Sequence, residues 1–258
     1  MVTAYPVAGK AKSVEICKMF IRGCGGRMGD PGQPQLSEGA AFFYGVDASN
    51  LHLWKQILDD PTREYYYCDN SYFDESRQQY FRVTKNRLQH TGSGNSNGER
   101  FNALNIKIKP QIKGGEYIVV CPQSDSFMAN IVGYRGSWTQ HTLEDLRVVS
   151  KRPVRLRLWS PAKHELASTL VDDLKDAHAL VTWSSAAAIT SVLNGVPAFC
   201  SKQCAAAVVG NLDFGTLGFP YFFGEGFIRN WAGVLADNQW TLDEMNKGKA
   251  WEDLHNAD

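Results

Sequence analysis

The segment 178–197, HALVTWSSAAAITSVLNGVP, carries the sharpest chemical signal in the chain. An apolar run ends in Ser184 and Ser185, and a stretch of small residues with helical character begins at once. The free N–H groups at a helix start, with the helix dipole behind them, suit a phosphate, and small side chains let the backbone approach it. The segment therefore predicts a phosphate-binding turn, and the alternative is an ordinary serine cap on a buried helix.

Two further apolar runs, at 116–122 and 153–159, carry or lead to polar residues. These residues are Gln123, Ser124, Arg155, Arg157, Ser160 and Lys163. Ligands of open α/β sheets bind at the carboxyl ends of the strands, so we expect these groups to converge near Ser184. A planar guanidinium suits a diphosphate because it binds two oxygens at once. Arg155 and Arg157 have the same parity along a strand, so both can face one side of the sheet, where an anion or acid would offset the cost of burying them.

Gly9 and Lys10 belong to an N-terminal stretch, VAGKAKS, that only partly matches a Walker A loop. They lack its upstream glycine and its following hydroxyl, so the motif is not met. We still expect Gly9 and Lys10 to lie in a glycine turn that contributes to the phosphate site. The glycines at 92, 94 and 98 likewise miss the GxGxxG spacing, and no helix is expected after them.

The cysteines and acidic residues show no complete metal-ligand pattern. Cys200 and Cys204 have a spacing that metal ligands use, but no second pair completes a site. The motifs HExxH and GxSxG do not occur, and the carboxylates form no spaced triplet. We therefore expect thiols and no metal ion. The N-terminus has no apolar leader, so the expected location is a reducing cytoplasm.

The composition restricts the class of protein. A chain of 258 residues, 43% apolar, suffices for one large domain or two small ones. Lys plus Arg and Asp plus Glu each number 27, which excludes a generally basic coat for non-specific nucleic-acid binding. No run of 18 apolar residues occurs, so no membrane partner is expected. Residues 76–113 nevertheless hold eight basic residues and one acid, which indicates either a solvated face or a cleft that attracts phosphate.

The elements that must position these groups alternate between strand and helix. AAFFYGV at 40–46 fits a buried strand, and 49–60 has helical spacing with Ser49 as its N-cap. The segment 64–70 is typical of a strand and ends in an Asp-Asn pair that favours a turn. Together they form one βαβ unit.

A polar region, 71–113, separates this unit from a second alternating series. It contains a loop at 90–100 and the stretch IKIKP at 106–110, which is an exposed strand or a linker. In the second series, strands are expected at 116–122, 153–159, 178–183 and 197–200, and helices at 142–149, 164–177 and 185–194. After 225 the pattern is helical, and TLDE at 241–244 matches a capping box.

Alternating strands and helices indicate the α/β class with parallel, doubly wound sheets. Two such series indicate two Rossmann-like lobes, which we place at 1–112 and 113–224. A helical tail, 225–258, is expected to pack back on the lobes. The oligomeric state is not predicted.

Three segments of the second series carry a family resemblance. They are CPQSD, RLRLWS and ALVTWSSAAAITSVLNGVPAF. They resemble the donor-binding lobe of GT-B-fold glycosyltransferases, and most of all the capsular-polysaccharide type, over roughly residues 115–200. The blocks DNSYF…YFRVT and NQWTLDEM look like those of bacteriophage-encoded proteins of that type. For such a protein, the expected cytoplasm is that of the host cell.

The resemblance implies transfer of a sugar from a UDP-, GDP- or CDP-linked donor to a hydroxyl group, without a bound cofactor or metal ion. The implied donor-binding residues are Ser184, Ser185, Gln123, Ser124, Arg155, Arg157, Gly9 and Lys10. The first lobe would supply the general base, either Asp69 just after a strand or His90 in a polar loop that could close over the substrate. Asn70, Tyr72 and Arg82 are the expected acceptor contacts. The alternatives are an Asx-turn role for Asp69 and a plain surface position for His90.

The acceptor and the activity itself have alternatives. The viral resemblance and the basic segment 76–113 favour a hydroxymethylated base in DNA, whereas a surface polysaccharide or a small molecule is the alternative acceptor. The aromatic residues at 65–81 are expected mainly in the core, although with neighbouring arginines they could hold a flipped nucleotide. In a different class, the same lobes would bind and sequester a nucleotide without turnover. That alternative is favoured by Ala187 and Ala188, which stand where many relatives carry an acidic residue. A third alternative is a structural or host-interaction protein on a degenerate fold.

Overall fold

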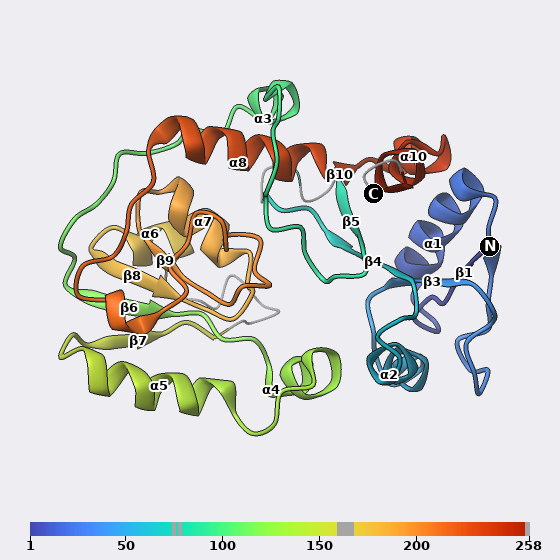
Figure 1. Cartoon of the computed structure of the whole chain (residues 1–258), viewed down its shortest axis with the longest axis horizontal. Coiled ribbons are helices and arrows are strands. Elements are labelled where there is room, and N and C mark those ends of the chain that lie inside the picture. Colours follow the sequence, from blue (N-terminus) through green and yellow to red (C-terminus); the bar gives the residue numbers. More distant parts are fainter. Residues whose placement is uncertain (74–75, 77–78, 159–167, 256–258) are drawn as a thin grey trace. The chain divides into compact units, whose positions relative to one another are not determined.

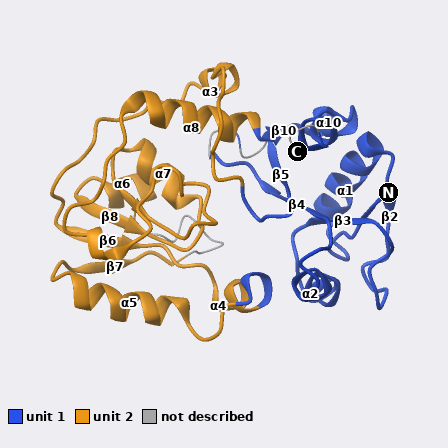
Figure 2. Cartoon of the chain, in the orientation of Figure 1, with its two compact units in different colours: residues 1–89, 130–133, 238–258 blue, residues 90–129, 134–237 orange. Residues whose placement is uncertain are grey.

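The computed structural model describes residues 1–73, 76, 79–158 and 168–255 (Figure 1). The chain divides into two compact units (Figure 2). The first unit comprises residues 1–89, 130–133 and 238–258, and the second comprises residues 90–129 and 134–237. The first boundary thus follows Gln89, whereas the sequence predicts a lobe that continues to 112, and the expected tail 225–258 is shared between the units.

The first unit is built on a six-stranded sheet with the order β10-β5-β4-β3-β1-β2. Its strands are β1 (Val2–Ala4), β2 (Arg27–Met28), β3 (Ala40–Tyr44), β4 (Tyr65–Asn70), β5 (Phe81–Lys85) and β10 (Gln239–Trp240). The strands β2, β1, β3 and β4 run parallel, whereas β5 pairs antiparallel with both β4 and β10. The strands predicted at 40–46 and 64–70 are confirmed as β3 and β4. The sequence misses β1, β2 and β10 because two or three residues are too few to show a hydrophobic period. It also misses β5, because Phe81–Lys85 alternates with charged residues inside the polar region 71–113, where no strand is predicted.

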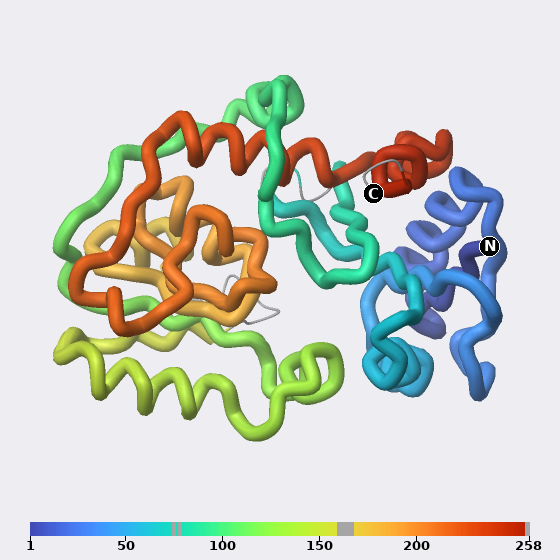
Figure 3. Tube along the Cα trace, in the orientation of Figure 1, coloured from blue at the N-terminus to red at the C-terminus, as the bar shows by residue number. Residues whose placement is uncertain are grey.

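In the described part of the first unit, four α-helices accompany the sheet. They are α1 (Ala11–Cys24), α2 (Leu51–Asp59), α9 (Leu242–Asn246) and α10 (Lys249–His255). The C-terminal segment lies beside α1, red against blue in Figure 3. Phe20 of α1 stacks on Phe42 of β3 with ring centroids 4.2 Å apart, and Trp251 of α10 meets Phe20 edge-on at 6.4 Å. These rings join the two ends of the chain in one core.

The start of α2 differs from the prediction. Asn50 is the N-cap residue of α2, and Ser49 lies outside the helix. The Ser49 hydroxyl donates instead to the Asp47 carboxylate at 2.7 Å, which removes it from the capping position.

The end of β4 also differs from the prediction. The Asp69–Asn70 pair does not form a turn, because β4 continues through Asn70. The strand β5 pairs with this stretch and places Arg82 directly opposite Asp69. The cross-strand partner, which lies 13 residues away in the chain, overrides the local preference of the pair for a turn.

The second unit is built on a four-stranded parallel sheet with the order β7-β6-β8-β9. Its strands are β6 (Tyr117–Val120), β7 (Val154–Leu156), β8 (Ala177–Val181) and β9 (Ala198–Phe199). All four lie within or beside predicted strands. The protein therefore belongs to the α/β class with mainly parallel sheets.

The helices of the second unit follow most of the predicted positions. They are α3 (Glu99–Ala103), α4 (Asp125–Phe127), α5 (Trp138–Val149), α6 (Leu170–Leu174), α7 (Ala187–Leu193) and α8 (Glu225–Asp237). A 3-10 turn lies at Phe214–Thr216. A π-helix at Met128–Val132 crosses the boundary, because its last three residues belong to the first unit. No helix in the described part of the chain combines the length and apolar character needed to cross a membrane. Ser160, Lys163 and the start of the helix predicted at 164–177 lie outside the described residues.

One prediction for the second unit is wrong. A helix, α3, does begin directly after Gly98, which adopts a left-handed φ of 75° at its N-cap. The stretch 106–110, predicted as either an exposed strand or a linker, forms no strand and is a linker. Its backbone instead donates from Lys109 to the Leu193 carbonyl at 2.8 Å, so it lies along the end of α7 as a connecting segment.

Gly195 ends α7 as the sequence predicts. Its φ of 79° is a left-handed conformation that glycine adopts without strain. A Cβ at this position would collide with the Pro110 carbonyl oxygen. Glycine thus permits both the end of α7 and the close passage of the connecting segment.

The predicted capping box at the start of α9 is confirmed. The Thr241 hydroxyl accepts from the Glu244 N–H at 3.2 Å, and the Glu244 carboxylate accepts from the Thr241 N–H at 2.7 Å. We expect Thr241→Ala to lower the free energy of unfolding by about 1 kcal/mol, because it removes the hydroxyl that accepts from the Glu244 N–H while the backbone N–H of residue 241 remains. Thr241→Ser, which keeps the hydroxyl, should stay close to wild type. Urea unfolding of both variants checks this, and equal stabilities for Ala and Ser would contradict it.

Candidate functional site

The side chain of Gln123 joins the carboxyl ends of β6 and β8 in the second unit. Gln123 follows β6, and Ser184 and Ser185 follow β8. With its oxygen turned toward them, the carboxamide accepts from the backbone N–H groups of Ser184 at 3.0 Å and of Ser185 at 2.6 Å. In this orientation the amide oxygen, and not the NH2 group, faces the two backbone N–H donors. The NH2 group then points away from the turn. The structure thus brings these three predicted residues together.

Further hydrogen bonds fill the turn after β8. The Thr182 hydroxyl donates to the Cys121 carbonyl at 2.5 Å and accepts from the Ser185 N–H at 3.3 Å. The Ser185 hydroxyl accepts from the Ala187 N–H at 3.2 Å. At the start of α7, the Ala186 N–H makes no hydrogen bond to the described residues. The predicted row of free N–H groups is therefore wrong, because side chains from two strand ends already satisfy most of them.

Burial decides which groups of this turn a ligand can reach. Ser184 is 6% exposed, whereas Ser185 and Gln123 are half-buried. The accessible groups are consequently the Ser185 hydroxyl and the Gln123 NH2, with Ser184 acting mainly through its backbone. Ser124 is exposed, but its hydroxyl accepts from the Phe127 N–H at 3.1 Å and caps α4.

The two predicted arginines are directed to different partners. The Arg155 guanidinium lies over the Tyr117 ring, 3.3 Å from its centroid. Tyr117 begins β6, so Arg155 points toward the amino end of that strand and not toward Ser184. Arg157 forms an ion pair with Asp173 of α6 and donates to the Ser168 carbonyl at 3.0 Å. Asp173 is the acid partner that offsets the partial burial of Arg157, and no bound anion is required for this.

His90 begins a loop that is fastened to α8. Its Nδ1 accepts from the Gly92 N–H at 3.0 Å. Further along, the Ser96 hydroxyl donates to the Asp237 carboxylate at 2.5 Å, and the Ser96 N–H donates to the Asn230 side chain at 3.1 Å. These contacts argue against the predicted loop that closes over a substrate, because closing would break them.

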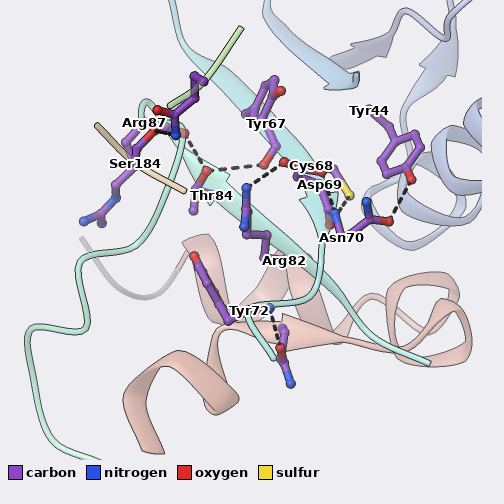
Figure 4. A network of polar contacts seen from close by, with 12 residues as sticks. Tyr44, Tyr67, Cys68, Asp69, Asn70, Tyr72, Arg82, Thr84, Arg87 and Ser184 are labelled. Atoms are coloured by element: carbon purple, nitrogen blue, oxygen red, sulfur yellow. Dashed lines mark hydrogen bonds and ion pairs between the residues drawn. The ribbon is translucent and has the colours of Figure 1, made fainter. Parts of the chain in front are cut away.

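In the first unit, Asp69 and Arg82 form a cross-strand ion pair (Figure 4). Arg82 Nη2 lies 2.6 Å from Asp69 Oδ2, and Asp69 Oδ1 accepts from the Asn70 N–H at 2.7 Å. The Asp69 side chain is 39% exposed, against 9% for Arg82. Burial disfavours the Arg82 charge and is the largest single effect, but the Asp69 carboxylate together with Tyr72, Tyr67 and Cys68 outweighs it and raises the pKa of Arg82. Asp69 is thus a reachable carboxylate held in place by a buried cation.

Two predicted acceptor contacts are interior groups. Tyr72 is 2% exposed, and its ring lies under the Arg82 guanidinium at 5.2 Å. Arg82 Nε is buried without a hydrogen-bond partner in the described structure. Both side chains therefore lie in the interior next to Asp69, and neither offers an exposed surface to an acceptor.

Asn70 is the accessible member of the predicted acceptor contacts. Its side-chain oxygen accepts from the Tyr44 hydroxyl at 3.2 Å and from Lys12 Nζ at 3.1 Å. The Lys12 ammonium also lies 5.1 Å from the centroid of the Phe81 ring. Burial raises the pKa of Tyr44, so its hydroxyl stays a neutral donor.

Gly9 and Lys10 form the turn between β1 and α1. Gly9 adopts a left-handed φ of 72°, which confirms the predicted glycine turn. Lys10 Nζ lies 3.3 Å from the Asp47 carboxylate and is mainly exposed. Both residues belong to the first unit, whereas Gln123, Ser184 and Ser185 belong to the second.

A cavity of about 540 Å³ opens beside Lys12 within the first unit. Its lining includes Lys12 and Glu15 of α1, Phe81 of β5, and Thr241 and Asp243 at the start of α9. Asp243 is paired with Lys247 at 2.6 Å. The lining thus combines charged, hydroxyl and apolar groups.

The cysteines are free thiols, and all but the half-buried Cys24 are buried. Burial raises the pKa of Cys17 and of Cys121 to about 12. No group of three or more metal-ligating side chains occurs in the described ranges.

Lys12, Tyr44 and Thr182 are polar residues of these sites that the sequence did not single out. Lys12 lies in the first turn of α1, a helix absent from the predicted elements. Thr182 and Tyr44 sit at strand ends, a signal that could have identified them.

Solved structures of two enzymes have a fold similar to that of this chain. A KpsC of Thermosulfurimonas dismutans, described as a beta Kdo 2,7 transferase, is similar with a TM-score of 0.54 and 12% identity over 98% of this chain and 99% of that one. A second KpsC structure from this organism, described as a beta Kdo 2,4 transferase, has a TM-score of 0.51 and 11% identity over 90% of each chain. No family model and no curated protein matches the sequence. At such identities the likeness concerns the fold.

The contact between the loop after His90 and α8 is testable at Gly92. A Cβ at Gly92 would collide with the Trp231 ring, and its φ of 80° adds strain. Gly98 has a similar φ of 75° and only an ordinary contact, so Gly98→Ala measures the strain alone, about 1 kcal/mol. We expect Gly92→Ala to cost about 1–3 kcal/mol more than Gly98→Ala in urea unfolding. Equal costs would show that the loop does not pack on Trp231.

Proposed function

We propose that the protein is a glycosyltransferase that moves a sugar from a nucleotide-linked donor to a hydroxyl acceptor. The observation that carries the proposal is the turn formed by Gln123, Ser184 and Ser185 at the carboxyl ends of parallel strands, where α/β folds bind their ligands. The similarity of the fold to two Kdo transferases supports it. A nucleotide-linked Kdo is accordingly among the donors to test.

In this proposal the second unit binds the donor phosphates. Bond cleavage places negative charge on the leaving phosphate, and donors already in position stabilise it without reorganisation. The Gln123 NH2, the Ser185 hydroxyl and the Ala186 N–H are such donors. Arg155, Arg157 and Ser124 would contribute only after leaving their present partners, and Gly9 and Lys10 would act from the first unit.

Asp69 is the proposed general base. Its partly exposed carboxylate takes the proton of the acceptor hydroxyl as that oxygen attacks the sugar carbon. Arg82 keeps the carboxylate oriented, and Asn70 lies next to it with its amide available at the surface. His90 is a second candidate, although its Nδ1 is already used by the loop.

The cavity beside Lys12 is the proposed place for the acceptor. Its mixture of ammonium, carboxylate and hydroxyl groups with an aromatic ring suits a hydroxyl-rich molecule such as a saccharide. The carboxylates of Glu15 and Asp243 disfavour the phosphates of DNA at the same rim. A hydroxymethylated DNA base, motivated by the basic segment 76–113 and the resemblance to phage proteins, is therefore the second acceptor to assay.

A non-catalytic nucleotide-binding protein is the second candidate function. The contacts of Asp69 favour it, because Oδ2 is held by the Arg82 guanidinium and Oδ1 by the Asn70 N–H, which leaves less of the carboxylate open to an acceptor hydroxyl. A protein of this kind would bind the nucleotide-linked sugar and release it unchanged.

Donor binding is testable at the accessible groups of the turn. We expect Ser185→Ala and Gln123→Ala each to weaken binding of the nucleotide-sugar about 10-fold, which is ~1.4 kcal/mol. Ser150→Ala, at the end of α5, is the matched control and should bind as wild type. Thermal shifts against UDP-, GDP- and CDP-linked sugars, including nucleotide-linked Kdo, first identify the donor, and calorimetry then measures affinity. No shift with any of them would overturn both proposed functions.

The role of Asp69 separates the enzyme from the binding protein. We expect Asp69→Asn to lower turnover by about 10²–10⁴-fold while donor affinity stays unchanged. Asp60→Asn, an exposed acid bonded to Thr62, is the control with normal turnover. The readout is nucleotide release with saccharide acceptors and with hydroxymethylcytosine-containing DNA.

Loss of the Asp69 charge leaves Arg82 buried and unpaired, which costs about 3–5 kcal/mol and requires a check of folding. Asp69→Glu keeps the charge but moves the carboxylate, and it should also slow turnover. Full turnover in a folded Asp69→Asn variant would reject Asp69 as the base. Donor binding by wild type without any product would identify the binding protein.

A further inference from the structure

Three aromatic side chains form a row that starts at the turn after β8. Trp183 directly precedes Ser184 and is half-buried. The Tyr134 ring meets the Trp183 ring edge-on, with centroids 5.8 Å apart and an interplanar angle of 63°. The His141 ring follows at 5.9 Å from Tyr134, and the Tyr134 oxygen lies 2.8 Å from His141 Nδ1. All three residues belong to the second unit, and the functions assigned above use none of them.

The row is anchored at the ends of two neighbouring strands. The Ser137 hydroxyl, at the start of α5, donates to the Asp125 carboxylate just after β6 at 3.3 Å. The Trp183 carbonyl accepts from the Ser201 N–H after β9 at 3.0 Å. Gly136 packs against the His141 ring, since a Cβ there would lie 3.2 Å from His141 Cε1. The rings are therefore held at fixed positions beside the Gln123–Ser184–Ser185 turn.

The spacing and exposure of these three rings indicate the kind of ligand that they suit. The rings extend outward from a turn that offers donors to phosphate, in steps of 5.8 and 5.9 Å. A nucleotide has the same order of parts, with the base separated from its phosphates by a ribose. Tyr134 and Trp183 are half-buried and His141 is exposed, so ring surface is available to a planar partner. Aromatic rings stack on nucleobases, because every base offers a flat π-face.

We propose that Trp183, Tyr134 and His141 form the binding site for the nucleobase of the donor, an inference that rests on the proposed function. Trp183 and Tyr134 provide the stacking surface. When the Tyr134 hydroxyl donates to Nδ1, the neutral His141 ring carries its proton on Nε2. That N–H is a donor for a ring carbonyl, which uracil, cytosine and guanine have and adenine lacks. The favoured donors are thus uridine, cytidine or guanosine nucleotides.

The experiment compares nucleoside diphosphates with pyrophosphate on the full chain by calorimetry. The probes are UDP, CDP, GDP, ADP and pyrophosphate. Wild type should bind at least one of the first three about 10-fold or more tighter than pyrophosphate and tighter than ADP. Trp183→Leu should remove that advantage and leave the affinity for pyrophosphate unchanged, whereas Trp183→Phe should retain most of it. Tyr221→Leu removes an exposed ring elsewhere in the second unit and is the matched control.

The role of His141 has a separate readout. His141→Phe keeps a ring but lacks the N–H, so it should abolish the preference over ADP while preserving the preference over pyrophosphate. Tyr134→Leu should weaken all nucleoside diphosphates. Circular dichroism confirms that each variant is folded, and the Trp183→Phe and Tyr134→Leu variants decide the matter if Trp183→Leu does not fold.

The outcomes separate this inference from the proposed function. If nucleotides bind wild type and the folded Trp183 and Tyr134 variants bind them equally well, the nucleobase site is overturned and the glycosyltransferase proposal stands. If no nucleotide binds wild type better than pyrophosphate, the nucleobase site is also overturned. If neither nucleotides nor nucleotide-sugars bind at all, the proposed function fails with it.

Discussion

The proposed donor site depends on one side chain that reaches from the end of one strand to the end of its neighbour. Parallel strands bring their carboxyl ends to the same edge of a sheet, where the backbone donors of the following turn need partners. Gln123 supplies its amide oxygen to two of them, at Ser184 and Ser185, and presents its NH2 outward. Thr182 closes the same turn against Cys121. Most backbone N–H groups of the turn are therefore already bonded, and a ligand meets the Gln123 NH2 group and the Ser185 hydroxyl instead.

A comparable constraint shapes the first unit. Arg82 is buried in β5, and a buried charge needs a charged partner. Asp69 is that partner, so its partly exposed carboxylate is held in a fixed orientation. The same pairing occupies Asp69 Oδ2, and Oδ1 accepts from the Asn70 N–H. The two functions considered for this chain differ in whether this paired carboxylate takes a proton from an acceptor.

The predictions from sequence succeeded where the signal is local. Apolar runs of five or six residues identified β3 and β4, and the capping box at Thr241 marked the start of α9 correctly. The predictions failed for β1, because a three-residue strand shows no hydrophobic period. They failed for α1, because the Gly9-Lys10 stretch just before it was interpreted only as a possible phosphate motif. They also failed for the loop after His90, whose polar composition indicates exposure although its backbone is fastened to α8. Amino-acid composition indicates whether side chains prefer solvent. It does not show which hydrogen-bond partners a helix far away in the chain provides.

The α/β class, the strand-turn-helix around Ser184 and the glycine turns at Gly9 and Gly195 can be predicted from sequence, since these depend on neighbours within a few positions. Which polar groups are free to act depends on the three-dimensional fold. Arg157 is paired with Asp173, and Gln123 occupies the donors after β8. These partners lie far apart in the chain, and hydrogen bonding and ion pairing depend on distance in space, which the order of residues does not contain.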